Sequence, residues 1–130
     1  MNKKFLFLIL LISISLLKNE KIKAMEDGEL TEQECHFLLR NSKTQKLNLT
    51  GSNISQPKLL EILSFLANDR DAKTELTEHN LSFNSEIIEI PNQIFYFENL
   101  KIINITGTNI YLSDANLQKL IFNKVKVIKE

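Results

Sequence analysis

The sequence predicts an α/β repeat fold, a short solenoid in which a curved parallel sheet of about four short strands carries helices or irregular turns on its convex side. Three strand-like runs of similar sequence recur along the chain, at residues 47–54, 74–81 and 103–110. Their starts are 27 and 29 residues apart (74 − 47 and 103 − 74), a spacing typical of repeat proteins. Apolar segments separate the runs, and such units gain a core only by stacking on their neighbours.

The first 24 residues have the pattern of a secretory signal segment. A short basic start precedes an apolar run at residues 5–17. As a helix this run rises only about 20 Å, too short for a hydrocarbon layer of about 30 Å. We therefore expect a signal peptide over residues 1–24, cleaved after Ala24, and a secreted or periplasmic protein. The alternative is a membrane anchor formed by residues 5–17.

The remaining domain is mildly acidic and has a single cysteine. Without residues 1–24, Lys and Arg fall from 16 to 11 and Asp and Glu from 16 to 15, so the formal charge goes from 0 to −4 (11 − 15). This charge disfavours nucleic acid as a partner. Because Cys35 is the only cysteine, no intrachain disulfide forms and packing has to stabilise the domain.

The N-terminal capping region, residues 25–43, is expected to begin with a flexible lead-in over 25–30. Thr31 stands three residues before Glu34. This is the spacing of a capping box, in which a hydroxyl and a carboxylate satisfy free amides at the start of a helix. We therefore predict a helix over 32–40 that caps the first repeat.

Four strands and three connections make up the repeat region, residues 44–130. The first connection is predicted to be a helix that Ser55 caps. The second, over 87–97, contains proline with β-branched and aromatic residues, which favour an extended or single-turn segment. The third is predicted to be a helix over 114–121 with Ser113 as its cap. Alternating apolar residues predict the strands at 46–49, 74–76, 102–105 and 125–128.

These repeats resemble the leucine-rich repeat family, whose unit reads L-x-x-L-x-L-x-x-N/C-x-L. The matching positions are Thr44, Leu47, Leu49, Ser52 and Ile54; Asp71, Thr74, Leu76, His79 and Leu81; and Leu100, Ile103, Ile105, Thr108 and Ile110. The resemblance implies a solenoid with a repeat core formed by Leu47, Leu49, Ile54, Leu76, Leu81, Leu100, Ile103, Ile105, Ile110, Val125 and Val127.

One position departs from the family pattern. Where the family has a buried asparagine that ties neighbouring turns together, this chain has Ser52, His79 and Thr108. Hydroxyl groups satisfy loop amides at shorter reach, so Ser52 and Thr108 are expected to substitute for it. Either the middle turn is irregular or His79 is tipped outward. Gly51 and Gly107, at equivalent positions, are expected to be turn residues.

The expected function is that of an exported, non-catalytic protein-interaction module without a cofactor or a bound metal. It is expected to bind a protein partner through the concave strand face or the exposed strand edge, and self-association through the C-terminal strand edge is a further expectation. A rigid parallel sheet needs little ordering on association. The concave-face residues are Asn48, Thr50, Glu75, Thr77, Asn104, Thr106 and Lys126.

Two alternatives stay open at this point. One is a small hydrolase that uses His79 with Glu75 or Glu78; the other is a structural remnant of a longer repeat array. A metal site is not expected, because the neighbouring Cys35 and His36 diverge by about 100° on a helix. Glycosylation in a eukaryotic secretory host is a conditional expectation for the Asn-x-Ser/Thr triplets at Asn48, Asn53, Asn80 and Asn104.

Overall fold

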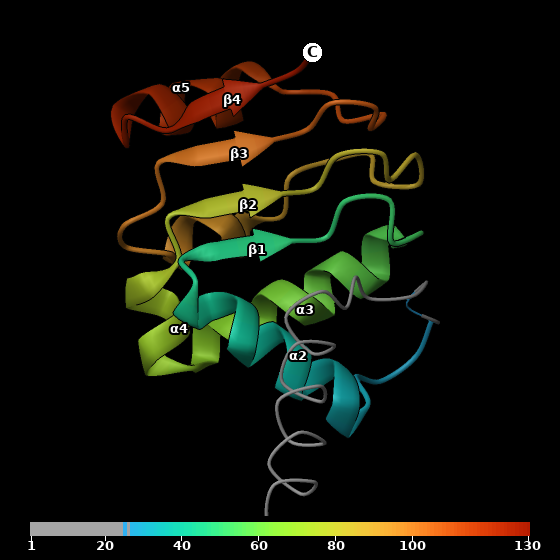
Figure 1. Ribbon diagram of the computed structural model, residues 1–130. Coiled ribbons are helices and arrows are strands. Elements are labelled where there is room, and N and C mark those ends of the chain that lie inside the picture. Colours follow the sequence, from blue (N-terminus) through green and yellow to red (C-terminus); the bar gives the residue numbers. More distant parts are fainter. Residues whose placement is uncertain (1–24, 26) are drawn as a thin grey trace, which may run out of the picture.

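The computed structural model describes residue 25 and residues 27–130 (Figure 1). The expected signal peptide or membrane anchor lies outside the described residues. The described chain has an α/β fold with a four-stranded, all-parallel sheet. Within this part of the chain, no helix is long and apolar enough to cross a membrane.

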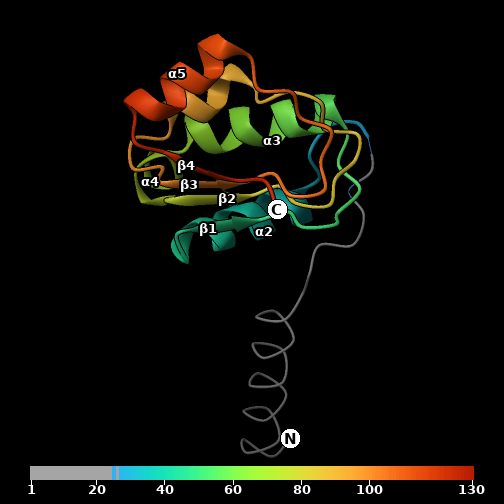
Figure 2. The ribbon, with the colours of Figure 1, turned by 90° about the horizontal axis from the view of Figure 1, so that it is seen from above.

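The strands lie in the sheet in chain order, β1-β2-β3-β4, so each one adds to the edge left by the one before. Helices α3 and α5 lie on one face of this sheet (Figure 2), and α2 lies next to β1 at the end where the domain begins (Figure 1). The elements are α2 (Glu32–Lys43), β1 (Lys46–Asn48), α3 (Gln56–Asn68), α4 (Arg70–Glu75), β2 (Glu78–Asn80), η1 (Asn92–Tyr96), β3 (Ile102–Asn104), α5 (Asp114–Phe122) and β4 (Lys126–Ile128).

Side-chain caps fix where the three longest helices begin. The Thr31 hydroxyl accepts the Glu34 N–H at 3.1 Å, and the Glu34 carboxylate accepts the Thr31 N–H at 3.0 Å, which confirms the predicted capping box. Ser55 and Ser113 cap α3 and α5 as predicted. The second connection contains the single-turn 3₁₀ helix η1, as its proline and β-branched residues indicated.

The middle strand lies four residues beyond its predicted start. Residues 74–76 were expected to be a strand, but Thr74 and Glu75 form the end of α4, a helix that the Asp69 carboxylate caps at its start by accepting the Ala72 N–H at 2.8 Å. The strand β2 begins only at Glu78. In the observed register, Leu47 pairs with His79, His79 with Ile103, and Ile103 with Val127.

The strand positions 47, 79, 103 and 127 are therefore equivalent, at spacings of 32, 24 and 24 residues. The longer first spacing contains two helices, α3 and α4, whereas the other two contain one helical segment each. In the fourth strand, predicted over 125–128 and observed over Lys126–Ile128, Val127 is the partner of Ile103.

The same register places Asn84 where Ser52 and Thr108 stand in the neighbouring turns. The Asn84 side chain is buried, and its Nδ2 donates to the carbonyl oxygens of Leu49, Leu81 and Ser82 at 2.7, 3.0 and 3.2 Å. Its Oδ1 accepts the Ile54 N–H at 3.0 Å. A buried asparagine thus ties the turn after β2 to the turn after β1, and the assignment of His79 to this position was wrong.

His79 lies in the core and not at the surface. Its side chain is fully buried in the row between Leu47 and Ile103, where the strands before and after it have aliphatic residues. The imidazole meets the Phe97 ring edge-on, with 4.5 Å between the ring centroids. Of the two alternatives for this position, an irregular middle turn or a His79 tipped outward, the second is wrong, because the strand alternation turns this side chain inward.

The predicted core is buried for the most part. Eight of its members are buried: Leu47, Leu49, Ile54, Leu76, Leu81, Leu100, Ile103 and Ile105. The other three, Ile110, Val125 and Val127, are only partly buried. These three lie toward the C-terminal end of the sheet, where no further described strand covers the core.

In the turns after the first three strands, the residues at the equivalent positions 51, 83 and 107 have a left-handed backbone conformation. Gly51 and Gly107 have φ values of 58° and 68°, which confirms them as turn residues. Phe83 adopts φ 58° although it has a Cβ. A Cβ on Gly107 would lie 2.6 Å from Cδ1 of Phe83. The second glycine therefore also makes room for the phenylalanine ring.

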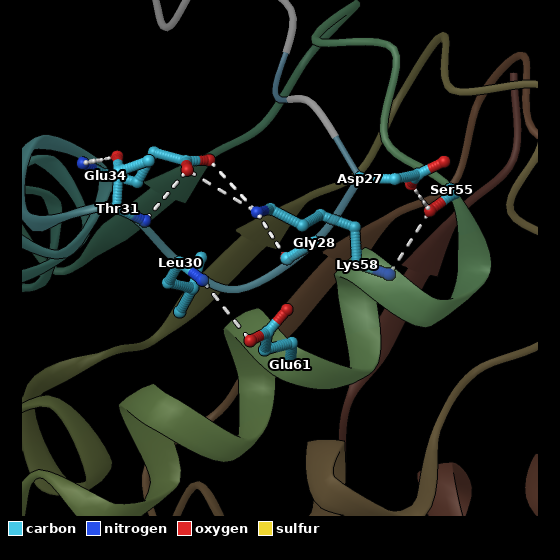
Figure 3. A network of polar contacts seen from close by, with 8 residues as sticks. All are labelled: Asp27, Gly28, Leu30, Thr31, Glu34, Ser55, Lys58 and Glu61. Atoms are coloured by element: carbon cyan, nitrogen blue, oxygen red, sulfur yellow. Dashed lines mark hydrogen bonds and ion pairs between the residues drawn. The ribbon is translucent and has the colours of Figure 1, made fainter.

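Residue 25 and residues 27–30 are held in place and are not a loose lead-in. Figure 3 shows this segment against the first turns of α3. The Ser55 hydroxyl donates to the Asp27 carboxylate, and the Leu30 N–H donates to Oε1 of Glu61 at 3.3 Å. The expected flexibility is corrected, because residues about 30 positions away along the chain provide these partners.

The central group of this network is the ammonium of Lys58, whose side chain is 1% exposed. Its Nζ donates to the Gly28 carbonyl oxygen at 3.0 Å and to Oε1 of Glu34 at 3.4 Å, and it lies 3.3 Å from Oε2 of Glu34 (Figure 3). Partial burial raises the pKa of Glu34, but the hydrogen bonds from Thr31 and the charge of Lys58 outweigh it and hold this pKa below its usual value.

Replacing Lys58 with methionine is expected to lower the free energy of unfolding by about 2 kcal/mol, because it leaves the Glu34 carboxylate and the Gly28 carbonyl without their shared donor. The measurement is urea unfolding at pH 7. A matched control is Lys73→Met, which breaks the more exposed ion pair with Glu98 and is expected to lower it by about 0.5 kcal/mol or less. Equal losses in both variants would contradict the structural role of Lys58.

Candidate interaction surface

The face of the sheet opposite α3 and α5 displays a row of asparagines. Asn48, Asn80 and Asn104 occupy equivalent positions on adjacent strands, and we call them the asparagine row. Each side-chain Oδ1 accepts the backbone N–H two residues on, at 3.2, 3.1 and 3.0 Å. These bonds end the strands and fix all three side chains in the same conformation, since an Asx turn orients the whole carboxamide.

The residues that donate those N–H groups form a second row, the hydroxyl row, of Thr50, Ser82 and Thr106. The hydroxyls of Thr50 and Ser82 lie 3.2 Å apart across the two strands. The Ser82 hydroxyl also donates to Oδ1 of Asn80 at 2.6 Å. Side-chain hydrogen bonds therefore connect the two rows across the first two strands, and Asn104 and Thr106 continue both rows at the third strand.

At the other end of the strands the same face carries charge. Lys46 on β1 and Glu78 on β2 are register partners, and their charged groups lie 3.7 Å apart. The same position is Ile102 on β3 and Lys126 on β4. The face therefore changes from an ion pair over the first two strands to an apolar and a basic residue over the last two.

The structure brings together most of the residues expected on this face. Asn48, Thr50, Asn104, Thr106 and Lys126 were expected there, and the strand register places them on it. Glu75 and Thr77 do not belong to the face. Glu75 is the last residue of α4, and the Thr77 N–H and hydroxyl both donate to the Gln45 carbonyl oxygen.

On the middle strand, this face is formed by Glu78, Asn80 and Ser82. They stand beside β1 where the predicted strand at 74–76 was expected. The signal for them was present in the sequence, because Asn80-Leu81-Ser82 repeats the triplets Asn48-Leu49-Thr50 and Asn104-Ile105-Thr106. Aligning the three triplets gives the observed register directly. The predicted register was off by five residues (79 − 74), because Leu76 was placed in a strand.

His79 has no geometry for acid-base catalysis. Both ring nitrogens are buried, and neither has a hydrogen-bond partner among the described residues. Burial lowers the pKa of His79 to about 3, because the protein interior disfavours the charged imidazolium. Glu78 precedes it on the strand and points to the opposite face, so the expected pairing of this carboxylate with the histidine is not formed.

The cysteine and the second histidine lie apart from the asparagine row, on α2. Cys35 is a free thiol of intermediate exposure, and His36 lies 3.6 Å from the exposed Glu32 carboxylate. In the described part of the chain, no cluster of three or more His, Cys, Asp and Glu side chains is arranged to hold a metal ion.

The strand β4 departs from the pattern of the others. Its residue 129 is equivalent to Leu49, Leu81 and Ile105, which are buried, but it is an exposed lysine. Its Ile128 is equivalent to the members of the asparagine row. The polar surface therefore ends at β3, and β4 forms a surface of different chemistry.

The arrangement is that of a polar face, held by internal hydrogen bonds, beside β4, the last strand of the described sheet, with buried residues behind the face. No protein-family model, no curated protein and no solved structure matches this chain.

Proposed function

We propose that this protein is an exported, non-catalytic interaction module with the architecture of a leucine-rich-repeat solenoid, and that it binds a protein partner through the asparagine and hydroxyl rows. The corrected register supports the resemblance. The residues Leu76, His79, Leu81 and Asn84 follow the spacing L-x-x-L-x-L-x-x-N, and Asn84 forms the bonds between turns that the family's asparagine forms.

The observation that carries the proposal is the hydrogen bond that all three members of the asparagine row share. Because each Oδ1 accepts a backbone N–H, each Nδ2 points away from that bond and keeps two donors, and none of the three bonds to a described acceptor. Adjacent strands bring these donors about 4.8 Å apart. Such a regular row of donors fits the carbonyl and carboxylate oxygens of a protein surface.

Rigidity makes this surface suited to binding. The side chains of the asparagine row are held by bonds within the protein, and the turns below them are anchored by the buried Asn84. Less side-chain freedom is lost when a partner docks on a surface that is already ordered. A partner therefore gains its hydrogen bonds at a small entropic cost.

The test is capture of partners with the Asn80→Asp variant. Aspartate keeps the oxygen that accepts the Ser82 N–H but replaces the Nδ2 donors with a charged acceptor. A protein captured from an extract of the source cell by the wild type is expected to be recovered about tenfold less with Asn80→Asp, as judged by quantitative mass spectrometry.

The matched control is Asn92→Asp, which makes the same chemical change at an exposed position in η1, away from the rows. It is expected to capture as much partner as the wild type. The proposal is wrong if no protein is enriched over the bare support, or if both variants capture the same proteins in the same amounts.

A further inference from the structure

We propose that the outer edge of β4 binds an acidic, extended segment of another protein, which adds to the sheet as a fifth strand. This surface is separate from the asparagine and hydroxyl rows, so the inference goes beyond the proposed function. Four observations support it: the direction of the backbone groups of β4, the charge of the surrounding side chains, the exposed apolar residues of α5, and the cover over the opposite edge of the sheet.

The backbone of β4 offers hydrogen-bonding groups on its outer side. The Lys126 N–H donates to the Lys101 carbonyl oxygen at 2.7 Å, and the Ile128 carbonyl oxygen accepts the Ile105 N–H at 2.8 Å. In a parallel ladder, alternate residues bond to opposite sides. Val127 therefore directs both its N–H and its carbonyl oxygen outward, where β4 is the last strand among the described residues.

The side chains around this edge are basic, although the domain is acidic. Residues 113–130 have four lysines and two acidic residues, a net charge of +2 (4 − 2). Residues 25–112 have seven basic and thirteen acidic residues, a net charge of −6 (7 − 13). Lys124, Lys126 and Lys129 are all exposed beside the edge. An acidic segment is therefore attracted to this end of the domain and repelled by the rest.

Apolar side chains beside the edge indicate what else the segment contains. On α5, Leu117, Ile121 and Phe122 are 40%, 67% and 86% exposed. Val127 is only partly buried, whereas Leu47, His79 and Ile103 at equivalent positions are fully buried. Successive side chains of a strand point to opposite faces. A segment that alternates aliphatic and acidic residues covers Val127 with its aliphatic side chains and places its carboxylates on the opposite face, where Lys126 stands.

A second copy of this chain fits the edge less well. Two β4 edges related by a two-fold axis would bring the same lysines together, which is unfavourable. Head-to-tail pairing is blocked, because α2 covers the outer edge of β1, where Oδ1 of Asn41 accepts the Asn48 N–H at 2.9 Å. An anionic membrane matches the charge, but hydrocarbon offers no partner for the outward backbone groups of Val127.

The probe is a blocked seven-residue peptide that alternates valine and glutamate, measured by fluorescence anisotropy with the full chain. It is expected to bind saturably, and more weakly as salt is added, since the attraction is between exposed charges. Two matched peptides are controls, one with lysine in place of glutamate and one N-methylated on the backbone groups that face the edge. Both are expected to bind about tenfold more weakly or worse.

Variants of the protein test the same edge. Val127→Pro removes the outward N–H and leaves the bonds to β3 intact, so it is expected to weaken binding about tenfold. Reversing Lys124, Lys126 and Lys129 to glutamate is expected to weaken it by about the same factor or more. The control for charge reverses three exposed basic residues elsewhere and is expected to change affinity by about twofold or less; these residues are Arg40, Lys43 and Arg70.

The inference is wrong if the glutamate peptide does not bind saturably, or if the lysine or N-methylated peptide binds as tightly as the glutamate peptide. It is also wrong if the protein forms a dimer that Val127→Pro abolishes, or if it binds phosphatidylserine vesicles and not the peptide. Because the peptide controls use the unaltered protein, they remain decisive if a variant fails to fold. Failure here leaves the Asn80→Asp capture result unaffected, since Asn80 lies on β2 and outside this edge.

Discussion

Replacing Asn84 with alanine is expected to lower the free energy of unfolding by about 3 to 5 kcal/mol, one of the two largest effects that the structure predicts. The substitution removes hydrogen bonds to the carbonyl oxygens of Leu49, Leu81 and Ser82 and to the Ile54 N–H, inside a turn that excludes water. Each buried group left without a partner costs about 1 to 3 kcal/mol. Urea unfolding followed by circular dichroism measures the loss.

The matched control for this prediction is Asn92→Ala, at an exposed position whose side chain has no such role. A change of about 0.5 kcal/mol or less is expected there. The variant Asn84→Asp adds a second check, because it keeps the acceptor for the Ile54 N–H and loses the three donor bonds. If Asn84→Ala were as stable as Asn92→Ala, the bonds between turns would not stabilise the fold.

Replacing His79 with leucine is expected to raise the free energy of unfolding by about 1 kcal/mol or more at pH 7, because two buried ring nitrogens without partners are replaced by a methyl-bearing side chain. The equivalent positions on the neighbouring strands, Leu47 and Ile103, already have aliphatic residues. The gain is reduced by the lost edge-on contact with Phe97.

The same substitution is expected to change the response to acid. Because the pKa of His79 is about 3 when folded and about 6.5 when unfolded, the unfolded chain binds an extra proton between these pH values. Stability from the neutral, buried imidazole is complete above pH 6.5 and is lost as the pH falls below it. The loss is about 1.4 kcal/mol per pH unit, or about 3 kcal/mol between pH 7 and 4.5.

Unfolding curves of the wild type and His79→Leu at several pH values test this. Their difference is expected to widen to about 4 kcal/mol at pH 4.5. Glu34 also contributes to acid unfolding, because the stability from its lowered pKa is complete above its usual pKa and is lost as the pH falls from there through the lowered pKa, but this contribution is common to both proteins. His36→Leu, at an exposed histidine, is the control. A constant difference across the pH range would contradict the buried, neutral state of His79.

Local signals in the sequence predicted the ends of elements better than the phase of the middle strand. The capping residues Thr31, Ser55 and Ser113 act within three residues of themselves, so sequence spacing alone locates them. The strand Glu78–Asn80 has a histidine at its inward position between two polar residues, so it shows no hydrophobic alternation. Leu76 is buried without being in a strand, and it shifted the prediction.

Features that depend on contacts between distant residues could not be predicted from the sequence. The lead-in over 25–30 is polar and contains a glycine, as mobile segments do. Asp27, Gly28 and Leu30 in it are fixed by the α3 cap Ser55 and by Lys58 and Glu61 on α3, and nothing in its own composition indicates these partners. The sequence predicted a polar surface of this kind, because strand alternation placed Asn48 and Asn104 on the face opposite the core. It did not predict the register of the middle strand.

The unequal ends of the sheet give the domain a direction of unfolding. At one end α2 covers β1, and its Asn41 bonds to the outer edge of that strand. At the other end β4 has one neighbouring strand and a partly exposed core. Each inner strand pairs only with the strand before and the strand after it. On heating we therefore expect the C-terminal strand to open before the strands nearer α2.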